Sequence, residues 1–176
     1  RSDKPRTGVA SGRGIACVLY EGDNGYVALV AEVDVDQDTG EIAVTRFVVA
    51  LDVGPISNPD GARNQLEGGL LQGLSRAVSE EVTLDSAKVT SVDWAGYKSL
   101  FLPDWYHLRS KVGSQIPVVE TVLINRPDGP AMGAGETAIT VVAAAVGNAI
   151  FDATGVRLRE VPFTPERVRT ALSRSR

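Results

Sequence analysis

The chain has only one cysteine and one histidine among its 176 residues. A single cysteine excludes an internal disulfide, and it excludes an iron–sulfur cluster held by this chain, because such clusters need several thiolates. Cys17 lies in the apolar run Ile15-Ala16-Cys17-Val18-Leu19, which predicts a small core side chain. His107 cannot build a histidine-based metal site by itself, and a Ser-His-Asp triad that depends on it has little support.

Long hydrophobic runs and basic charge are also scarce. No apolar stretch reaches the length of a membrane span, and the N-terminus lacks the apolar core of a secretory signal. The net charge is -4, and the basic residues are scattered, which argues against a nucleic-acid partner because no stripe of charge could follow phosphates. With 43% hydrophobic residues the chain can bury a proper core, as one domain or two small subdomains.

The sequence opens with a polar segment. Residues 1–12 are rich in Gly, Pro and Ser, which predicts a linker or domain boundary before a domain at residues 13–176. A first strand is expected near Gly14–Tyr20. Further strand character is found at Ile116–Ile124 and at Val156–Val161.

A long antiparallel hairpin is predicted from two alternating segments. From Gly25 to Asp36 apolar residues alternate with acidic ones, as in a half-buried strand. Gln37-Asp38-Thr39-Gly40 supplies turn residues, and the alternation resumes from Glu41 to Asp52. In this second strand one face is expected to carry Ile42, Val44, Val48 and Ala50.

A glycine-bearing helix should follow. Asn58-Pro59-Asp60 combines an N-cap side chain, a proline at the first helical position and an acid in the first turn, and apolar periodicity runs to about Glu80. Its glycines each cost roughly 1 kcal/mol relative to alanine, which close packing or a ligand must offset. Gln65 is either a polar handle toward a ligand or a cap for a stray carbonyl where the glycines meet another helix. One helix face carries Gly61, Gln65, Gly68 and Gln72.

The stretch Gly133-Ala134-Gly135-Glu136-Thr137 places one carboxylate between a glycine hinge and an apolar helix. Residues 138–153 are apolar on every side, which predicts a buried helix, and Gly155 should end it. Two interpretations of Glu136 remain open. It caps the free N–H groups at the helix start, or it serves a ligand that the glycines allow to approach the backbone. A short helix is expected at Pro165–Leu172.

Residues 81–115 have short apolar pieces among polar residues, which predicts strands or loops. The segment also contains an aromatic patch. These rings either line a substrate entrance or belong to a core or subunit interface. The patch consists of Trp94, Tyr97, Phe101, Trp105 and Tyr106.

An ordered set of motifs resembles the xanthine dehydrogenase/aldehyde oxidase family, specifically the C-terminal molybdopterin-binding domain of the large subunit in bacterial members of the isoquinoline 1-oxidoreductase type. The resemblance runs from about Lys4 to Leu172. The matching motifs, in chain order, are Gly12-Arg13-Gly14-Ile15-Ala16, Asp38-Thr39-Gly40, Asn58-Pro59-Asp60, Gln65-Leu66-Glu67-Gly68-Gly69, Gln72-Gly73-Leu74-Ser75, Gly133-Ala134-Gly135-Glu136, Asn148-Ala149-Ile150 and Gly155-Val156-Arg157.

The resemblance implies a molybdenum hydroxylase that inserts a water-derived oxygen into a carbon of an aldehyde or an N-heterocycle. Glu136 matches the family's catalytic general base. Gln65 matches a glutamine that hydrogen-bonds the pterin, and Gly133, Ala134 and Gly135 are expected at the cofactor. The metal needs no ligand from this chain. The segment Leu102–Pro117 is longer than the family's connection there.

The implied cofactor is molybdopterin or its cytosine dinucleotide form. The implied partners are the remainder of the large subunit and an iron–sulfur subunit, which receives the electrons, besides a small-molecule substrate. The alternative function is a non-catalytic binding or assembly domain of a larger oxidoreductase complex. Neither the substrate nor the compartment follows from these residues.

The fold class expected is α+β: a mixed sheet with a long antiparallel hairpin, packed against two main helices at Asn58–Glu80 and Thr137–Thr154. The first helix carries Gln65 and the second is preceded by Glu136, and both should converge on one cleft.

Overall fold

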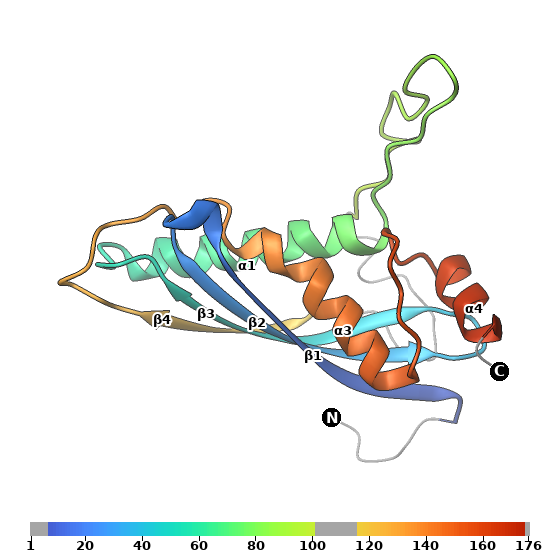
Figure 1. The fold of residues 1–176 in the computed structure, drawn as a ribbon, viewed down its shortest axis with the longest axis horizontal. Coiled ribbons are helices and arrows are strands. Elements are labelled where there is room, and N and C mark those ends of the chain that lie inside the picture. Colours follow the sequence, from blue (N-terminus) through green and yellow to red (C-terminus); the bar gives the residue numbers. More distant parts are fainter. Residues whose placement is uncertain (1–6, 101–115, 175–176) are drawn as a thin grey trace.

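The computed structural model describes residues 7–100 and 116–174, and its centre is a four-stranded sheet (Figure 1). The order across the sheet is β1-β2-β3-β4. The first three strands are antiparallel neighbours, whereas β4 runs parallel to β3. The sheet is therefore mixed, and the predicted α+β class with its long hairpin is confirmed. The strands are β1 (Val9–Leu19), β2 (Tyr26–Asp36), β3 (Ile42–Asp52) and β4 (Val118–Ile124).

β1 begins at Val9, so the last residues of the expected linker belong to the sheet. The first long helix, α1 (Pro59–Val78), is capped as predicted, because the Asn58 side chain accepts a hydrogen bond from the Gly61 N–H at 2.9 Å. The second begins as a 3₁₀ turn, η2 (Ala138–Val141), continues as α3 (Val142–Thr154), and ends at Gly155 with φ 74°. The predicted short C-terminal helix is α4 (Pro165–Arg174). In the described part of the chain, none of the helices has the length and apolar character that a membrane crossing requires.

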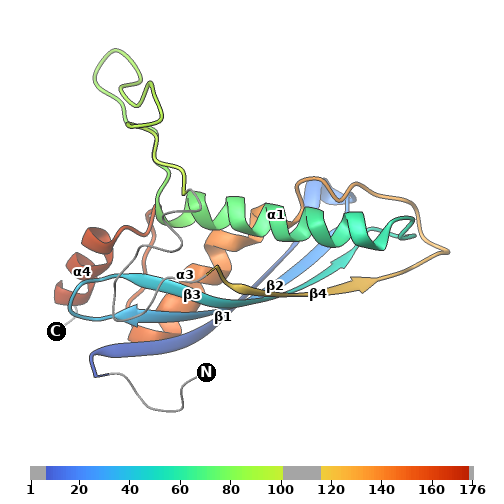
Figure 2. The same cartoon turned by 180° about the vertical axis from the view of Figure 1, so that it is seen from behind.

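The core lies between one face of the sheet and the two long helices, which cover that face together (Figure 2). The helices contribute small and branched side chains, so they pack close to the strands. The largest fully buried side chains are Leu29, Val33, Val35, Phe47, Val49, Leu51, Leu66, Leu70, Val142, Val146, Ile150 and Val168.

The prediction of which face of β3 is buried was wrong for half of the strand. Val44 is buried, but beyond it the buried residues are Phe47, Val49 and Leu51, while Val48 and Ala50 lie on the opposite face. The register explains this difference, because Glu32 pairs with Arg46 whereas Val33 pairs with Val44, which leaves Thr45 as an extra residue. A β-bulge inserts one residue and so inverts the alternation beyond it.

Gly12 and Gly14 allow β1 to lie directly against α3. A Cβ atom at Gly14 would sit 2.2 Å from the Ala145 carbonyl oxygen, and one at Gly12 would sit 2.3 Å from the Ala149 carbonyl oxygen. Both clashes are with the helix backbone, which cannot turn aside as a side chain can. The Gly12-Arg13-Gly14 motif is therefore explained by packing between a strand and a helix.

The other face of the sheet is open in this chain. Ile15 and Val118 are 63% and 60% exposed, and Leu19, Tyr26, Val122 and Ile124 are exposed as well. Cys17 belongs to this face and is exposed. The prediction that it is a core residue was wrong. Cys17 lies on the same side of β1 as Ile15 and Leu19, and this side points away from α3.

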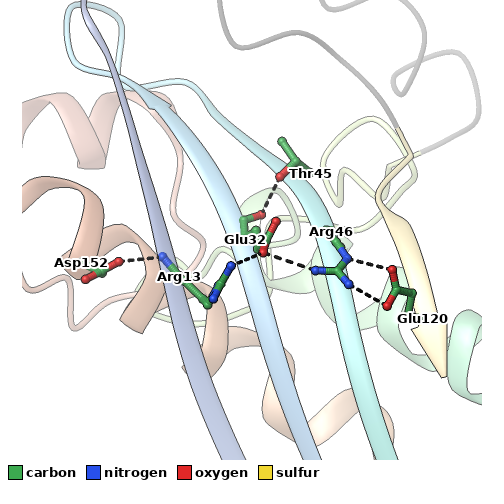
Figure 3. Close-up of polar contacts among 6 residues, drawn as sticks. All are labelled: Arg13, Glu32, Thr45, Arg46, Glu120 and Asp152. Atoms are coloured by element: carbon green, nitrogen blue, oxygen red, sulfur yellow. Dashed lines mark hydrogen bonds and ion pairs between the residues drawn. The ribbon is translucent and has the colours of Figure 1, made fainter. Parts of the chain in front are cut away.

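A row of ion pairs crosses the open face near the bulge (Figure 3). Glu32 on β2 is only 7% exposed. Its Oε1 forms ion pairs with a terminal nitrogen of Arg13 on β1 at 2.8 Å and with one of Arg46 on β3 at 3.5 Å. Arg46 also forms a two-pronged pair with Glu120 on β4, through its Nε at 3.0 Å and a terminal nitrogen at 2.6 Å. The row therefore connects all four strands, and the bulge residue Thr45 donates to the Glu32 carbonyl.

Two predicted segments gave different outcomes. Val156–Val161 is not a strand, because it pairs with no other strand of the described residues and leads into the turn before α4. Of the strands or loops expected from residue 81 onward, residues 79–99 form a loop with one isolated bridge between Leu84 and Val89, and this loop extends away from the end of α1 (Figure 1). Trp94 is 75% exposed there. Phe101, Trp105, Tyr106 and His107 lie outside the described residues.

Candidate functional site

The structure brings Gln65 and the Gly133–Glu136 loop together. Gln65 projects from the exposed side of α1, and its side-chain N–H donates to the Gly135 carbonyl oxygen at 2.6 Å. Glu136 follows Gly135 directly, so both predicted residues lie at one place although 70 positions separate the hydrogen-bonded pair. Of the two roles open for Gln65, the structure shows the cap on a stray carbonyl. Its amide oxygen still accepts no hydrogen bond from the part of the chain that is described.

Glu136 is exposed and does not cap the following helix. No side-chain cap hydrogen bond occurs at Thr137, where η2 begins. Instead, the hydroxyl of Tyr20 donates to Oε2 of Glu136 at 2.6 Å. This hydrogen bond, together with desolvation and the charges of Glu136 and Glu21, raises the pKa of Tyr20 to about 12. The phenol therefore stays protonated, and remains a donor to the carboxylate, across the physiological range.

The turn between β1 and β2 makes a second contact with the same loop. The Asn24 side-chain oxygen accepts a hydrogen bond from the Gly133 N–H at 2.9 Å, and its amide nitrogen donates to Glu21 at 3.0 Å. Ala134, one residue further, is partly buried against the core. The loop that presents Glu136 is thus held at Gly133 by the turn, at Ala134 by packing and at Gly135 by Gln65.

Three of the four glycines of α1 divide into two groups, whereas Gly61 lies against the Asn58 cap. Gly69 and Gly73 are buried against the second helix, where a Cβ atom at Gly73 would sit 2.6 Å from Val142. Gly68 has open space where a side chain would stand, and the same holds for Gly135. The sequence left two explanations for these glycines, a packing seam against another helix and a bare surface for a ligand. Both features are present, on different faces of α1.

Thr137 adds a buried polar atom next to Glu136. Its side chain is fully buried, and its hydroxyl has no hydrogen-bond partner within the described ranges. Leaving such a group unsatisfied costs about 1–3 kcal/mol.

Sequence reasoning did not identify Tyr20, Asn24 or Thr137 as site residues. Asn24-Gly25 is a recognisable turn signal, but nothing in it indicates a contact with residues more than 100 positions away. The described residues contain no group of three or more His, Cys, Asp or Glu side chains that could hold a metal ion. The polar groups described at the site are the Glu136 carboxylate, the amides of Gln65 and Asn24, the Tyr20 phenol, the Thr137 hydroxyl and backbone N–H and C=O groups.

The family model of the molybdopterin cofactor-binding domain matches residues 12–104. This chain belongs to the xanthine dehydrogenase family of molybdopterin-binding domains. The match contains Gln65 but ends before Glu136. A nicotinate dehydrogenase chain of Pseudomonas putida is 41% identical over 170 residues, which cover 93% of this chain and 13% of that protein.

Two further proteins support the membership. The beta chain of isoquinoline 1-oxidoreductase of Brevundimonas diminuta is 31% identical over 93% of this chain and 20% of its own length. The solved aldehyde oxidoreductase of Desulfovibrio gigas matches with a TM-score of 0.68 and 35% identity over 85% of this chain and 15% of that one. The chain therefore spans a fifth or less of the length of each of these three relatives.

Proposed function

We propose that this molybdopterin-binding domain supplies the general base, Glu136, and part of the cofactor surface of a molybdenum hydroxylase acting on an aldehyde or an N-heterocycle. The observation that supports the proposal is the hydrogen bond between Gln65 and Gly135, because Gly135 directly precedes Glu136 in the chain. Both side chains are exposed, so a ligand can reach them.

The residues at this place fit a flat cofactor that is rich in donors and acceptors. Gly68 and Gly135 leave the backbone bare, so a ring system can approach it closely. The amide oxygen of Gln65, which is exposed, offers a hydrogen bond to it. We propose that Gln65, Gly133, Ala134 and Gly135 form this chain's part of the cofactor surface.

The bound molybdopterin would supply the metal centre at which a water-derived oxygen is transferred to carbon. Glu136 would accept the proton that this transfer releases. An ionised carboxylate can only accept hydrogen bonds. With Oε2 held by the Tyr20 hydroxyl, Oε1 remains for the proton. A base must lie within about 2.6–3.2 Å of the proton donor, which a short side chain on a fixed loop can satisfy.

Replacing Glu136 by glutamine tests the role of the carboxylate, because the amide keeps the shape but loses the basicity. We expect kcat of the reconstituted assembly to fall by about 10²- to 10⁴-fold, with molybdenum and pterin retained. The matched control is Glu166→Gln, since Glu166 is also an exposed acid at the start of a helix but lies on α4. Unchanged turnover in Glu136→Gln with full molybdenum content would favour the alternative, a non-catalytic assembly domain.

We also propose that the open sheet face binds the remainder of the large subunit. Monomeric proteins rarely expose contiguous apolar patches of this kind, and relatives contain at least four-fifths of their length outside the matched segment. The ion-pair row from Arg13 to Glu120 crosses this face, so the contact would combine apolar and charged groups (Figure 3). An iron–sulfur subunit would carry electrons away, and the cofactor would be molybdopterin or its cytosine dinucleotide form.

Cys17 provides a probe of that contact, because it is exposed on the open face, on the edge strand β1, and is the chain's one cysteine. We expect the peptide that contains Cys17 to resist maleimide labelling in the intact assembly and to label fully after denaturation, as measured by mass spectrometry. Rapid labelling in the intact assembly would show that this face is not the contact. Exposed Ser11, also on β1, can be changed to cysteine as a comparison site further along the strand.

A further inference from the structure

The β1–β2 turn (residues 20–25) contacts the Glu136 loop at both ends. Tyr20 donates to the Glu136 carboxylate at 2.6 Å, and Asn24 accepts from the Gly133 N–H at 2.9 Å. The turn itself is fixed, because the Tyr20 N–H donates to the Gly25 carbonyl at 2.9 Å and the Asn24 N–H donates to the Tyr20 carbonyl at 2.8 Å. In Figure 1 the turn lies against the segment that leads into the second long helix.

We propose that Tyr20 is a positioning residue, whose hydroxyl fixes the Glu136 carboxylate in the orientation needed for proton transfer, with Asn24 holding the loop beneath it. The proposal rests on the proposed function of Glu136. It adds a residue from a hairpin turn that matches no site position in the resemblance.

The physical reason is the freedom of an exposed glutamate. A glutamate side chain has three rotatable bonds, and an exposed one without a partner would sample many orientations. The hydrogen bond from Tyr20 removes most of this freedom by fixing Oε2, while Oε1 remains available. Because a misplacement of about 1 Å can reduce a rate by about 10²-fold, fixing the carboxylate in advance contributes directly to kcat.

Tyrosine suits this position because its phenol is a strong donor that a nearby carboxylate does not deprotonate. The hydrogen bond to Glu136 is the largest of the causes, with desolvation and Glu21 among the others, that raise the pKa of Tyr20 to about 12. The proton shared with Oε2 therefore stays on Tyr20, and the carboxylate remains free to take a proton from elsewhere. Phenylalanine would keep the ring and its packing but remove the donor.

The first experiment measures the contact without turnover. The absorbance change of tyrosine ionisation is recorded against pH for the assembled protein and for its Tyr20→Phe variant, and the difference between the two curves reports Tyr20 alone. The same pair of measurements is repeated in the Glu136→Gln background. The two difference curves are then compared. At about pH 11 Tyr20 should be about one-tenth ionised with Glu136 and clearly more ionised with glutamine, because the hydrogen bond to Glu136 is the largest cause of its raised pKa. Equal ionisation in the two backgrounds would overturn the proposal.

The second experiment measures the consequence for the rate. Tyr20→Phe should lower kcat by about 10- to 10²-fold while KM and molybdenum content stay unchanged. The matched control is Tyr97→Phe, which loses a Tyr–Glu hydrogen bond to Glu80 at 2.5 Å outside the site. We expect Tyr97→Phe to leave kcat within about twofold, since this pair does not touch the Glu136 loop.

The outcomes separate this proposal from the proposed function. Full turnover in Glu136→Gln would overturn both. If Glu136→Gln is inactive but Tyr20→Phe matches Tyr97→Phe in kcat, the function of Glu136 stands and the role of Tyr20 falls. A purely structural role for Tyr20 would lower thermal stability or cofactor content in step with kcat, and that result would also refute positioning.

Discussion

Replacing Gly14 by alanine should destabilise the domain strongly, because β1 and α3 lie too close for a side chain. The added Cβ would sit 2.2 Å from both the Ala145 carbonyl oxygen and the Ala149 nitrogen. Reaching ordinary contact at 3.4 Å would require the strand and helix to separate by about 1.2 Å. Overpacking of this kind costs about 1–3 kcal/mol, and the upper end applies because both clashing atoms belong to a backbone.

The measurement is denaturant unfolding followed by circular dichroism, and the control is Gly68→Ala. Gly68 lies inside α1 with open space around the Cβ position, so alanine there should raise the free energy of unfolding by up to about 1 kcal/mol. The two variants add the same methyl group in opposite contexts. A Gly14→Ala variant as stable as the wild type would refute the close approach of β1 and α3.

Three further predictions concern the site and its pH dependence. Although Gly68→Ala stabilises the chain, it should weaken cofactor retention in the assembly, measured as molybdenum per protein, if the bare face meets the pterin. Thr137→Val removes the unsatisfied hydroxyl, so the chain without cofactor should become more stable by about 1 kcal/mol, and a loss of stability would show that the hydroxyl has a partner. The hydrogen bond and charge of Arg46 lower the pKa of Glu120 below 4.5, so this pair stabilises the fold above that pH, and the stabilisation is lost as the pH falls through the lowered pKa. The denaturation midpoint should drop over that range, and less so in Arg46→Gln.

Most of the elements could be predicted from the sequence because their signals are local. Alternating residues predicted β2 and the start of β3, Asn58-Pro59 predicted the start of α1, and Gly155 predicted the end of α3. A bulge carries no such signal, since Thr45 is an ordinary strand residue, and its single insertion inverted the faces of the second half of β3. The exposure of Cys17 was missed for a related reason: an apolar run shows that a strand is apolar, but not which of its faces is covered.

The sequence by itself determined the family, the carboxylate on its glycine hinge and the glutamine on a glycine-rich helix, since motifs of this kind are short and contiguous. Only the tertiary structure decided that Gln65 binds the Gly135 carbonyl and that Glu136 is held by Tyr20 rather than capping its helix. These contacts join residues 70 and 116 positions apart. No local propensity encodes such pairs, because they arise where the sheet, the hairpin turn and two helices pack together.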